Sequence, residues 1–394
     1  MDEFVSRKRD QEVKYSKEEG LPKKQKRNYS ELLPPSLTQD PSTNLYGCLF
    51  SSYDIFFMVN DDEDDSGIAR RISKGYKINI HADGDGPDKF YSKSKPLIHC
   101  YKGKMQGFGD FAILGSHIYG FYNRVSRVPT RDVSKLRVIP HVDKEWIPSP
   151  MICRRSFPHA SVIGGKIYVR NRQPYKHTDP QWGEVYDPVN EKWKDIPNPP
   201  NYPPNYREGI VISATVKNPD RIIVAHRVLG DDFSAIFYAY SVKHESWDML
   251  APARRKLHPL CTLEWLGKGV SAGNTINWLD RKDEIIVWFA YDFDLDVWLE
   301  GRLKSCQLCP RGTLPFLIHL EKQRFCLLQC VDDYVYYVIV NVSRMSNHNT
   351  LDISVVREQK YAMKLGESPI VSYCAILGRY IWERSTDGEG SNQQ

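Results

Sequence analysis

The sequence predicts an all-β fold, a six-bladed β-propeller in which each blade is a small sheet of four strands. Two observations predict it. Short runs of alternating apolar and polar residues recur along the chain and are bounded by Gly, Pro, Asn and Asp, as β-strands are. A tryptophan also recurs after a turn, at an interval close to the length of about fifty residues expected for one propeller blade.

The alternating runs start with DIFFMVN at 54–60 and continue to SYCAILGRYIW at 372–382. The clearest runs between them are ASVIGGKIYV, RIIVAHRV and EIIVWFAYDF, and no convincing helix of three turns separates them. Aromatic residues make up 12% of the chain, which also favours strands. We therefore expect strands throughout the folded part.

The tryptophans occupy the same place near the end of successive units, and their separations are 47, 54 and 51 residues: Trp146, Trp193, Trp247 and Trp298. One four-stranded blade cannot cover both of its faces, so it must stack on its neighbours. A bulky aromatic residue at a fixed place can fill the wedge between two blades. One period is therefore interpreted as one blade.

One unit resembles a complete kelch repeat. It runs from His159 to Val169 (HASVIGGKIYV) and continues from Val185 to Trp193 (VYDPVNEKW), and Tyr186 is one of its structural positions. The chain is most similar to the kelch regions of plant F-box/kelch proteins. It departs from that pattern because the paired glycines usual after the second strand are absent; Arg170 and Asn171 follow Val169. Gly164 and Gly165 lie instead at the hairpin turn between the first two strands.

The repeat predicts six blades at about 45–100, 105–152, 155–203, 207–253, 257–309 and 313–361. The remaining segment, 370–382, has the pattern of the first hairpin of a blade. We expect C-terminal strands to complete the first blade and close the ring, which removes exposed strand edges. The propeller is assigned to residues 45–384, and residues 385–394 are expected to be disordered.

Residues 1–44 are predicted to be a disordered basic tail and linker, because they are charged and end in a Pro/Ser/Thr-rich stretch. Their cluster PKKQKR resembles a nuclear localisation signal, which would bind an import receptor and place the protein in the nucleus, with a cytoplasmic pool as an alternative. The tail could instead serve only to keep the chain solvated. The signal residues are Lys23, Lys24, Lys26 and Arg27.

Composition excludes several classes of protein. No run of 18 apolar residues and no apolar N-terminal stretch occurs, so we expect an intracellular protein with no membrane segment. Residues 1–27 carry +3 of the net charge of +5, and the near-neutral remainder gives no reason to expect nucleic acid as a partner. Nine scattered cysteines suit reduced thiols better than a disulfide framework.

A zinc site is one interpretation of two close cysteine pairs, because four thiolates can bind Zn²⁺ tetrahedrally. The favoured alternative is that the second pair lies on one strand face and packs as small apolar residues. The residues concerned are Cys306, Cys309, Cys326 and Cys330.

No phosphate loop, GxSxG, HExxH or dinucleotide fingerprint is present, and the acidic runs lack calcium-loop spacing. We therefore expect no enzyme activity and no cofactor. A kelch-fold copper oxidase is a remote alternative that the resemblance leaves open.

A basic residue precedes the first strand of four successive blades: Arg155, Arg207, Arg255 and Arg311. Equivalent positions in a ring of blades point to one face, and in kelch adaptors this segment lies near the mouth of the central channel. These arginines could therefore bind an acidic or phosphorylated peptide. An equally weighted alternative is that they pair with nearby carboxylates of the chain.

The sequence thus favours a nuclear, non-enzymatic protein-protein interaction module that uses loops on one propeller face. The alternative is a substrate-recognition subunit of a ubiquitin-ligase complex, as the resemblance to F-box/kelch proteins implies. Residues 28–50 hold only a proline-interrupted fragment of the Leu-rich helical pattern of an F-box, so no F-box is recognisable.

Overall fold

The computed structural model describes the chain from Leu49 to Glu383, apart from segments that connect strands. All described residues belong to the compact unit Gly47–Gln394. The predicted tail 1–44, its nuclear localisation signal and residues 385–394 lie outside the described residues. The gaps within the described part are 64–69, 82–96, 104–107, 123–129, 138–141, 147–148, 156–157, 172–180, 201–209, 229–233, 251–254, 257–268, 283–284, 304–307, 309–313, 332–333, 347–348 and 363–369.

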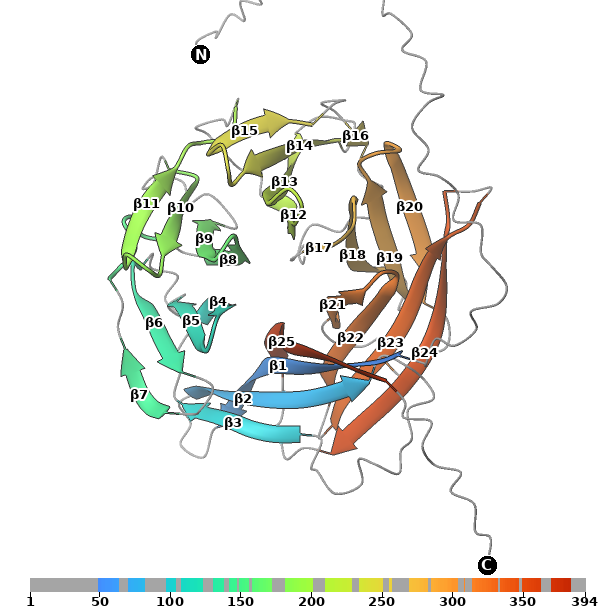
Figure 1. Cartoon of the computed structure of the whole chain (residues 1–394), viewed down its shortest axis with the longest axis horizontal. Helices are drawn as coiled ribbons and strands as arrows, with labels where there is room; N and C mark the ends of the chain where they lie inside the picture. Colours follow the sequence, from blue (N-terminus) through green and yellow to red (C-terminus); the bar gives the residue numbers. More distant parts are fainter. Residues whose placement is uncertain are drawn as a thin grey trace, which may run out of the picture. The chain divides into compact units, whose positions relative to one another are not determined.

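Six antiparallel sheets form a ring, as Figure 1 shows, and the described residues contain no helix. The predicted all-β, six-bladed propeller is confirmed. Blade 1 contains β25 (Ile370–Glu383), β1 (Leu49–Glu63), β2 (Arg70–His81) and β3 (Leu97–Gly103). Blade 2 contains β4 (Phe108–Leu114), β5 (His117–Tyr122), β6 (Val133–Arg137) and β7 (Val142–Trp146).

The other four blades repeat this plan. Blade 3 contains β8 (Pro158–Ile163), β9 (Lys166–Asn171), β10 (Gly183–Asp187) and β11 (Lys192–Ile196). Blade 4 contains β12 (Ile210–Val216), β13 (Arg221–Val228), β14 (Ser234–Ser241) and β15 (Ser246–Met249), with β16 (Arg255–Lys256) paired to β14. Blade 5 contains β17 (Val270–Ala272), β18 (Thr275–Lys282), β19 (Ile285–Asp292) and β20 (Val297–Arg302). Blade 6 contains β21 (Phe316–Glu321), β22 (Arg324–Val331), β23 (Tyr334–Arg344) and β24 (Leu351–Ala362).

Ring closure by the C-terminal segment is confirmed, but its predicted form was wrong. Residues 370–383 form one continuous strand rather than a hairpin, and β25 pairs with β1 from Leu49↔Glu383 to Asn60↔Ile370. Blade 1 already has three strands from the N-terminal part of the chain, so only its innermost strand is missing. Gly378 lies opposite Asp54 beside a register shift in this ladder.

Each core of the ring lies between two blades. Six clusters of buried apolar residues each combine side chains from neighbouring blades, including one between blade 6 and blade 1. We call each of these interfaces a seam. Both faces of a middle strand are therefore buried, which explains near-continuous apolar strands such as β19, where Ile286–Tyr291 are all buried.

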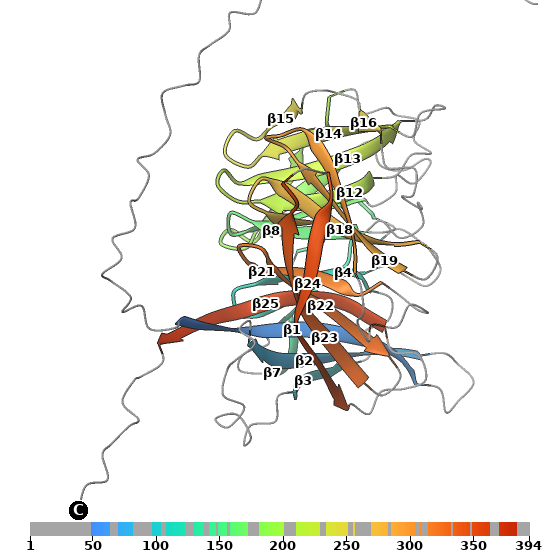
Figure 2. The same ribbon diagram turned by 90° about the vertical axis from the view of Figure 1, so that its right-hand side faces the viewer.

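The alternation of strand direction gives the ring two different faces. In blades 2 to 6, the first strand joins the second, and the third joins the fourth, on one side, which we call the turn face. The second strand joins the third, and each blade joins the next, on the opposite side, which we call the loop face. Figure 2 shows the ring from the side, with the strands running between these two faces.

Candidate functional site

The predicted glycine hairpin of blade 3 is confirmed. Gly164 and Gly165 have φ values of 58° and 71°, and they join β8 to β9 where Ile163 pairs with Lys166. A two-residue turn with positive φ at both positions matches the twist of the flanking strands and favours glycine. This turn lies on the turn face.

Three of the four repeated tryptophans pack against the preceding blade, as predicted. Trp193 on β11 contacts Phe121 of blade 2, with ring centroids 6.4 Å apart, and donates its indole hydrogen bond to the carbonyl oxygen of Ser149 (2.8 Å). Trp247 on β15 donates to the carbonyl oxygen of Pro197 (2.6 Å). Trp298 on β20 contacts Phe237 of blade 4, with ring centroids 5.9 Å apart.

The fourth repeated tryptophan, Trp146, ends β7, where its backbone pairs with that of Lys135. Nothing is described of its side chain.

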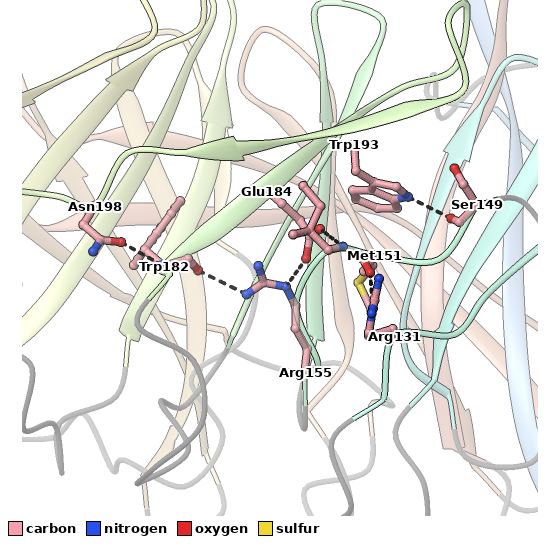
Figure 3. Close-up of polar contacts among 9 residues, drawn as sticks. Arg131, Ser149, Met151, Arg155, Trp182, Glu184, Trp193 and Asn198 are labelled. Atoms are coloured by element: carbon pink, nitrogen blue, oxygen red, sulfur yellow. Dashed lines mark hydrogen bonds and ion pairs between the residues drawn. The ribbon is translucent and has the colours of Figure 1, made fainter.

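Arg155 lies in the seam between blades 2 and 3 and is fully buried (0% exposed). Its Nε donates to Oε1 of Glu184 on β10 at 2.9 Å, and its Nη1 donates to the carbonyl oxygen of Trp182 at 3.4 Å (Figure 3). The second carboxylate oxygen of Glu184 accepts the backbone N–H of Ile152 at 2.6 Å. The pair therefore fastens the segment that enters blade 3 to the third strand of that blade.

The prediction that Arg155 contacts a partner is wrong for this residue. A guanidinium without solvent exposure that is already paired to a carboxylate cannot reach an external peptide. Burial raises the pKa of Glu184, while Arg155 and the backbone amides of Ile152 and Cys153 oppose that rise. The alternative, pairing with a carboxylate of the chain, describes Arg155.

The other three predicted arginines are not brought together by described contacts. Arg255 lies in β16, where its backbone pairs with that of Ala235, and its side chain lies outside the described residues. Arg207 and Arg311 also lie outside them. Partner binding by these three arginines stays a prediction.

A sequence signal for the Arg155 ion pair was available. Glu184 stands nine residues before Trp193, and the same offset from Trp247 and Trp298 gives Tyr238 and Phe289. Among these three blades, only blade 3 has a buried carboxylate at this position, so only its arginine, Arg155, has an acidic partner there.

The innermost strands surround a central channel that contains a cavity of about 230 Å³. Small side chains line much of it, and they come from several blades: Ala160 and Ser161 of β8, Ser213 of β12, Gly269 before β17 and Ala375 of β25. Because many of these lining side chains are small, the main polar groups in the channel are backbone groups and hydroxyls.

A buried polar cluster, which we call the relay, links blades 2, 3 and 4 next to this channel. Oδ2 of Asp110 on β4 accepts the backbone N–H of Ala160 (2.8 Å) and lies 3.9 Å from Nε2 of His159. Nη2 of Arg170 on β9 lies 2.7 Å from Nδ1 of His159 and also donates to Oγ of Ser213. Sequence reasoning missed Arg170 as a site residue.

Although the relay contains Ser, His and Asp, it does not have the geometry of a hydrolytic triad. A guanidinium only donates, so Nδ1 of His159 is the acceptor of the Arg170 hydrogen bond. That nitrogen faces Ser213 at 3.5 Å and is already engaged, so it cannot take the serine proton. The relay ties blades together and does not activate Ser213.

A groove of about 390 Å³ separates blades 3 and 4 on the turn face. Tyr168 and Tyr240 contribute aromatic surface, and Lys194 pairs with Glu245 across it. Burial, together with Glu245, raises the pKa of Tyr240 to about 12, so its hydroxyl stays protonated. The groove carries charges of both signs.

Cys326 and Cys330 are buried in the seam between blades 6 and 1, as the apolar alternative expects. Burial raises the pKa of both thiols, that of Cys330 to about 12, which disfavours the thiolates that zinc requires. Cys306 and Cys309 lie outside the described residues. Within the described part of the chain, no three metal-ligating side chains gather, and no helix has the length and apolar character to cross a membrane.

Comparison with known proteins shows a partial sequence similarity. No known family profile matches the chain. An F-box/kelch-repeat protein of Arabidopsis thaliana is 29% identical over 105 residues, which are 26% of this chain and 25% of that protein. The similarity thus covers about a quarter of each protein, and the rest of the relative has no counterpart in this match.

Solved structures with a related arrangement include candidate 6-phosphogluconolactonases of Bacteroides fragilis and Bacteroides uniformis. The first is 10% identical, and the match covers 77% of this chain and 82% of that protein with a TM-score of 0.41. The second is 8% identical, and the match covers 82% of this chain and 99% of that protein with a TM-score of 0.44. At this level of similarity, neither structure bears on what the chain does.

Proposed function

We propose that this chain is a kelch-type, non-enzymatic interaction protein that binds a protein partner through the loop face of its propeller. The six-bladed ring and the local similarity to an F-box/kelch-repeat protein support an interaction role in general. The nature of the partner and the face that it contacts are the new parts of the proposal.

The observation that carries the proposal is the difference between the two faces in blades 2 to 6. On the turn face the longest connection between strands is the segment 345–350, and most connections are tight turns such as 164–165. The loop face has the long connections, including 172–182, 197–209 and 303–315. Long loops on a rigid scaffold are the usual carriers of binding residues.

Arg207 and Arg311 belong to these long connections and are the best candidates for contacts with an acidic or phosphorylated peptide. Arg155 is excluded by its pairing with Glu184. We therefore expect charge reversal at Arg207 and Arg311 to abolish capture of the partner in affinity purification with mass spectrometry. Charge reversal at Lys192, exposed on the turn face, is the matched control and should leave capture unchanged.

Nuclear localisation is proposed from the basic cluster in residues 23–27. A fluorescent fusion of residues 1–30 should accumulate in nuclei, and an even distribution would contradict the proposal.

A second candidate is a substrate-recognition subunit of a ubiquitin ligase, favoured by the similarity to an F-box/kelch-repeat protein. It predicts that cullin-complex subunits co-purify with the chain. Their absence, together with capture of a loop-face partner, would favour the simple interaction role.

A further inference from the structure

We propose that the seam between blades 3 and 4, beside the central channel, binds an oxyanion through Arg170 and Trp182. The ligand is a carboxylate or a phosphate group. Its assignment to a side chain of a partner protein rests on the proposed function, whereas the anion site itself does not.

Arg170 is a buried cation without a directly bonded carboxylate. Its side chain is 1% exposed, and its hydrogen-bond partners, His159 and Ser213, are neutral acceptors. The nearest acidic influence is Asp110, which lies beyond His159 in the relay. Burial lowers the pKa of Arg170 to about 9, and Asp110 offsets only part of that effect. A buried charge of this kind is costly unless an opposite charge pairs with it.

Arg155 provides the contrast within the same blade. Both arginines are buried, but Arg155 has Glu184 at 2.9 Å and Arg170 has no carboxylate within ion-pair distance among the described residues. The chain therefore neutralises one of these charges directly and leaves the other with neutral partners.

Two N–H donors in this seam also lack an acceptor. Nε of Arg170 and Nε1 of Trp182 are buried and make no hydrogen bond within the described part of the chain. The two groups are neighbours, because the guanidinium carbon lies 5.7 Å from the centre of the Trp182 ring. Buried donors nearly always have a partner, and an oxyanion has enough lone pairs to accept from both.

The channel offers a route to this seam. Ser213 lines the channel cavity and accepts a hydrogen bond from Arg170, so a single side chain separates the cavity from the guanidinium. Arg170 is also the penultimate residue of β9, which ends at the loop face. His159 pairs with Arg170 across β8 and β9, so both relay residues lie at the loop-face end of blade 3.

The test measures thermal unfolding in sodium phosphate, sodium acetate and sodium chloride at equal ionic strength. We expect phosphate or acetate to raise the Tm of the wild type by at least about 2 °C above chloride, as ligand binding to the folded state requires. Arg170→Lys, which loses Nε and the planar fork, should lose at least half of this increase. Arg221→Lys, a partly exposed residue of β13, is the matched control and should retain it.

An equal increase in the wild type, Arg170→Lys and Arg221→Lys would overturn the site, because it would be a general salt effect. If Arg170→Lys does not fold, Trp182→Phe serves instead, since it removes the indole donor and keeps the guanidinium. A response to phosphate alone identifies a phosphorylated ligand, and a response to both anions identifies a carboxylate-type site. A chain that captures its partner but shows no anion response refutes this site while the proposed function stands.

Discussion

Arg155 and Glu184 form an ion pair that no solvent reaches, with Nε and Oε1 2.9 Å apart. The two residues are 29 positions apart in the sequence and belong to the entry and the third strand of blade 3. Their contact fixes the segment 149–155, which also receives the indole hydrogen bond of Trp193. An arginine expected to recognise a partner is thus part of the scaffold.

Replacement of Arg155 by alanine should strongly destabilise the propeller. The change leaves the carboxylate of Glu184 buried without its counter-ion, which costs about 3–5 kcal/mol in the free energy of unfolding. Urea unfolding at pH 7 measures the loss. The double variant Arg155→Met, Glu184→Met should lose less, since no charge is then left unpaired. A single variant within about 0.5 kcal/mol of the wild type would contradict the structural role.

The stability of the propeller should depend on the protonation of Glu184. Burial raises the pKa of this carboxyl above its ordinary value of 4.5, so the folded state keeps a proton that the unfolded state releases. The contribution of Glu184 to stability is therefore lost progressively as pH rises from 4.5 through the folded-state pKa. Urea unfolding between pH 4 and pH 7 should show the wild type losing stability relative to Glu184→Gln, and the opposite trend would refute the assignment.

The loss of stability on substitution of Gly164 or Gly165 should depend on the backbone conformation of the residue and on the space around its new Cβ. Both residues have positive φ, which costs an ordinary residue about 1–2 kcal/mol. A Cβ at Gly165 would meet open space, so only the backbone conformation determines the cost of substitution there. Gly165→Asn should therefore cost less than Gly165→Ala, because asparagine adopts a positive φ more readily. Gly164→Ala should cost more than Gly165→Ala, since its Cβ would lie 3.3 Å from Asp220 and Val242. Equal effects in thermal unfolding would argue against this turn.

Deletion of the residues after 366 should unfold or aggregate the propeller. It removes β25, and with it the innermost strand of blade 1 and one side of the seam with blade 6. The buried thiols of Cys326 and Cys330 then become exposed, so they should react with a thiol reagent many times faster than in the full chain. Unchanged thermal unfolding and unchanged thiol reactivity would refute closure by β25.

The sequence was sufficient for the architecture because the architecture is periodic. The spacing of Trp193, Trp247 and Trp298 reports a packing requirement that every seam repeats, and the structure confirms their contacts with the preceding blade. The hairpin at Gly164 was likewise predictable, because a positive φ imposes a local demand on residue type. Periodic and local signals survive in a single sequence.

The site residues were harder to predict because their roles depend on contacts across seams. The environment of Arg155 is decided by Glu184, which the chain brings near only after blade 3 has formed. Arg170 was visible as a departure from the paired glycines of the kelch pattern, but nothing local showed that it would be buried against His159 and Ser213. The single strand at 370–383 was missed because an apolar run with a central glycine fits a hairpin equally well.

Site-specific photo-crosslinking tests the central claim, binding of a protein partner on the loop face, most directly. A benzoylphenylalanine at Tyr206, next to Arg207 in a long loop-face connection, is compared with one at Val189, which is 88% exposed on the turn face. The account predicts that the partner is crosslinked from position 206 and not from position 189. Crosslinking from position 189 alone, with none from position 206, would contradict it.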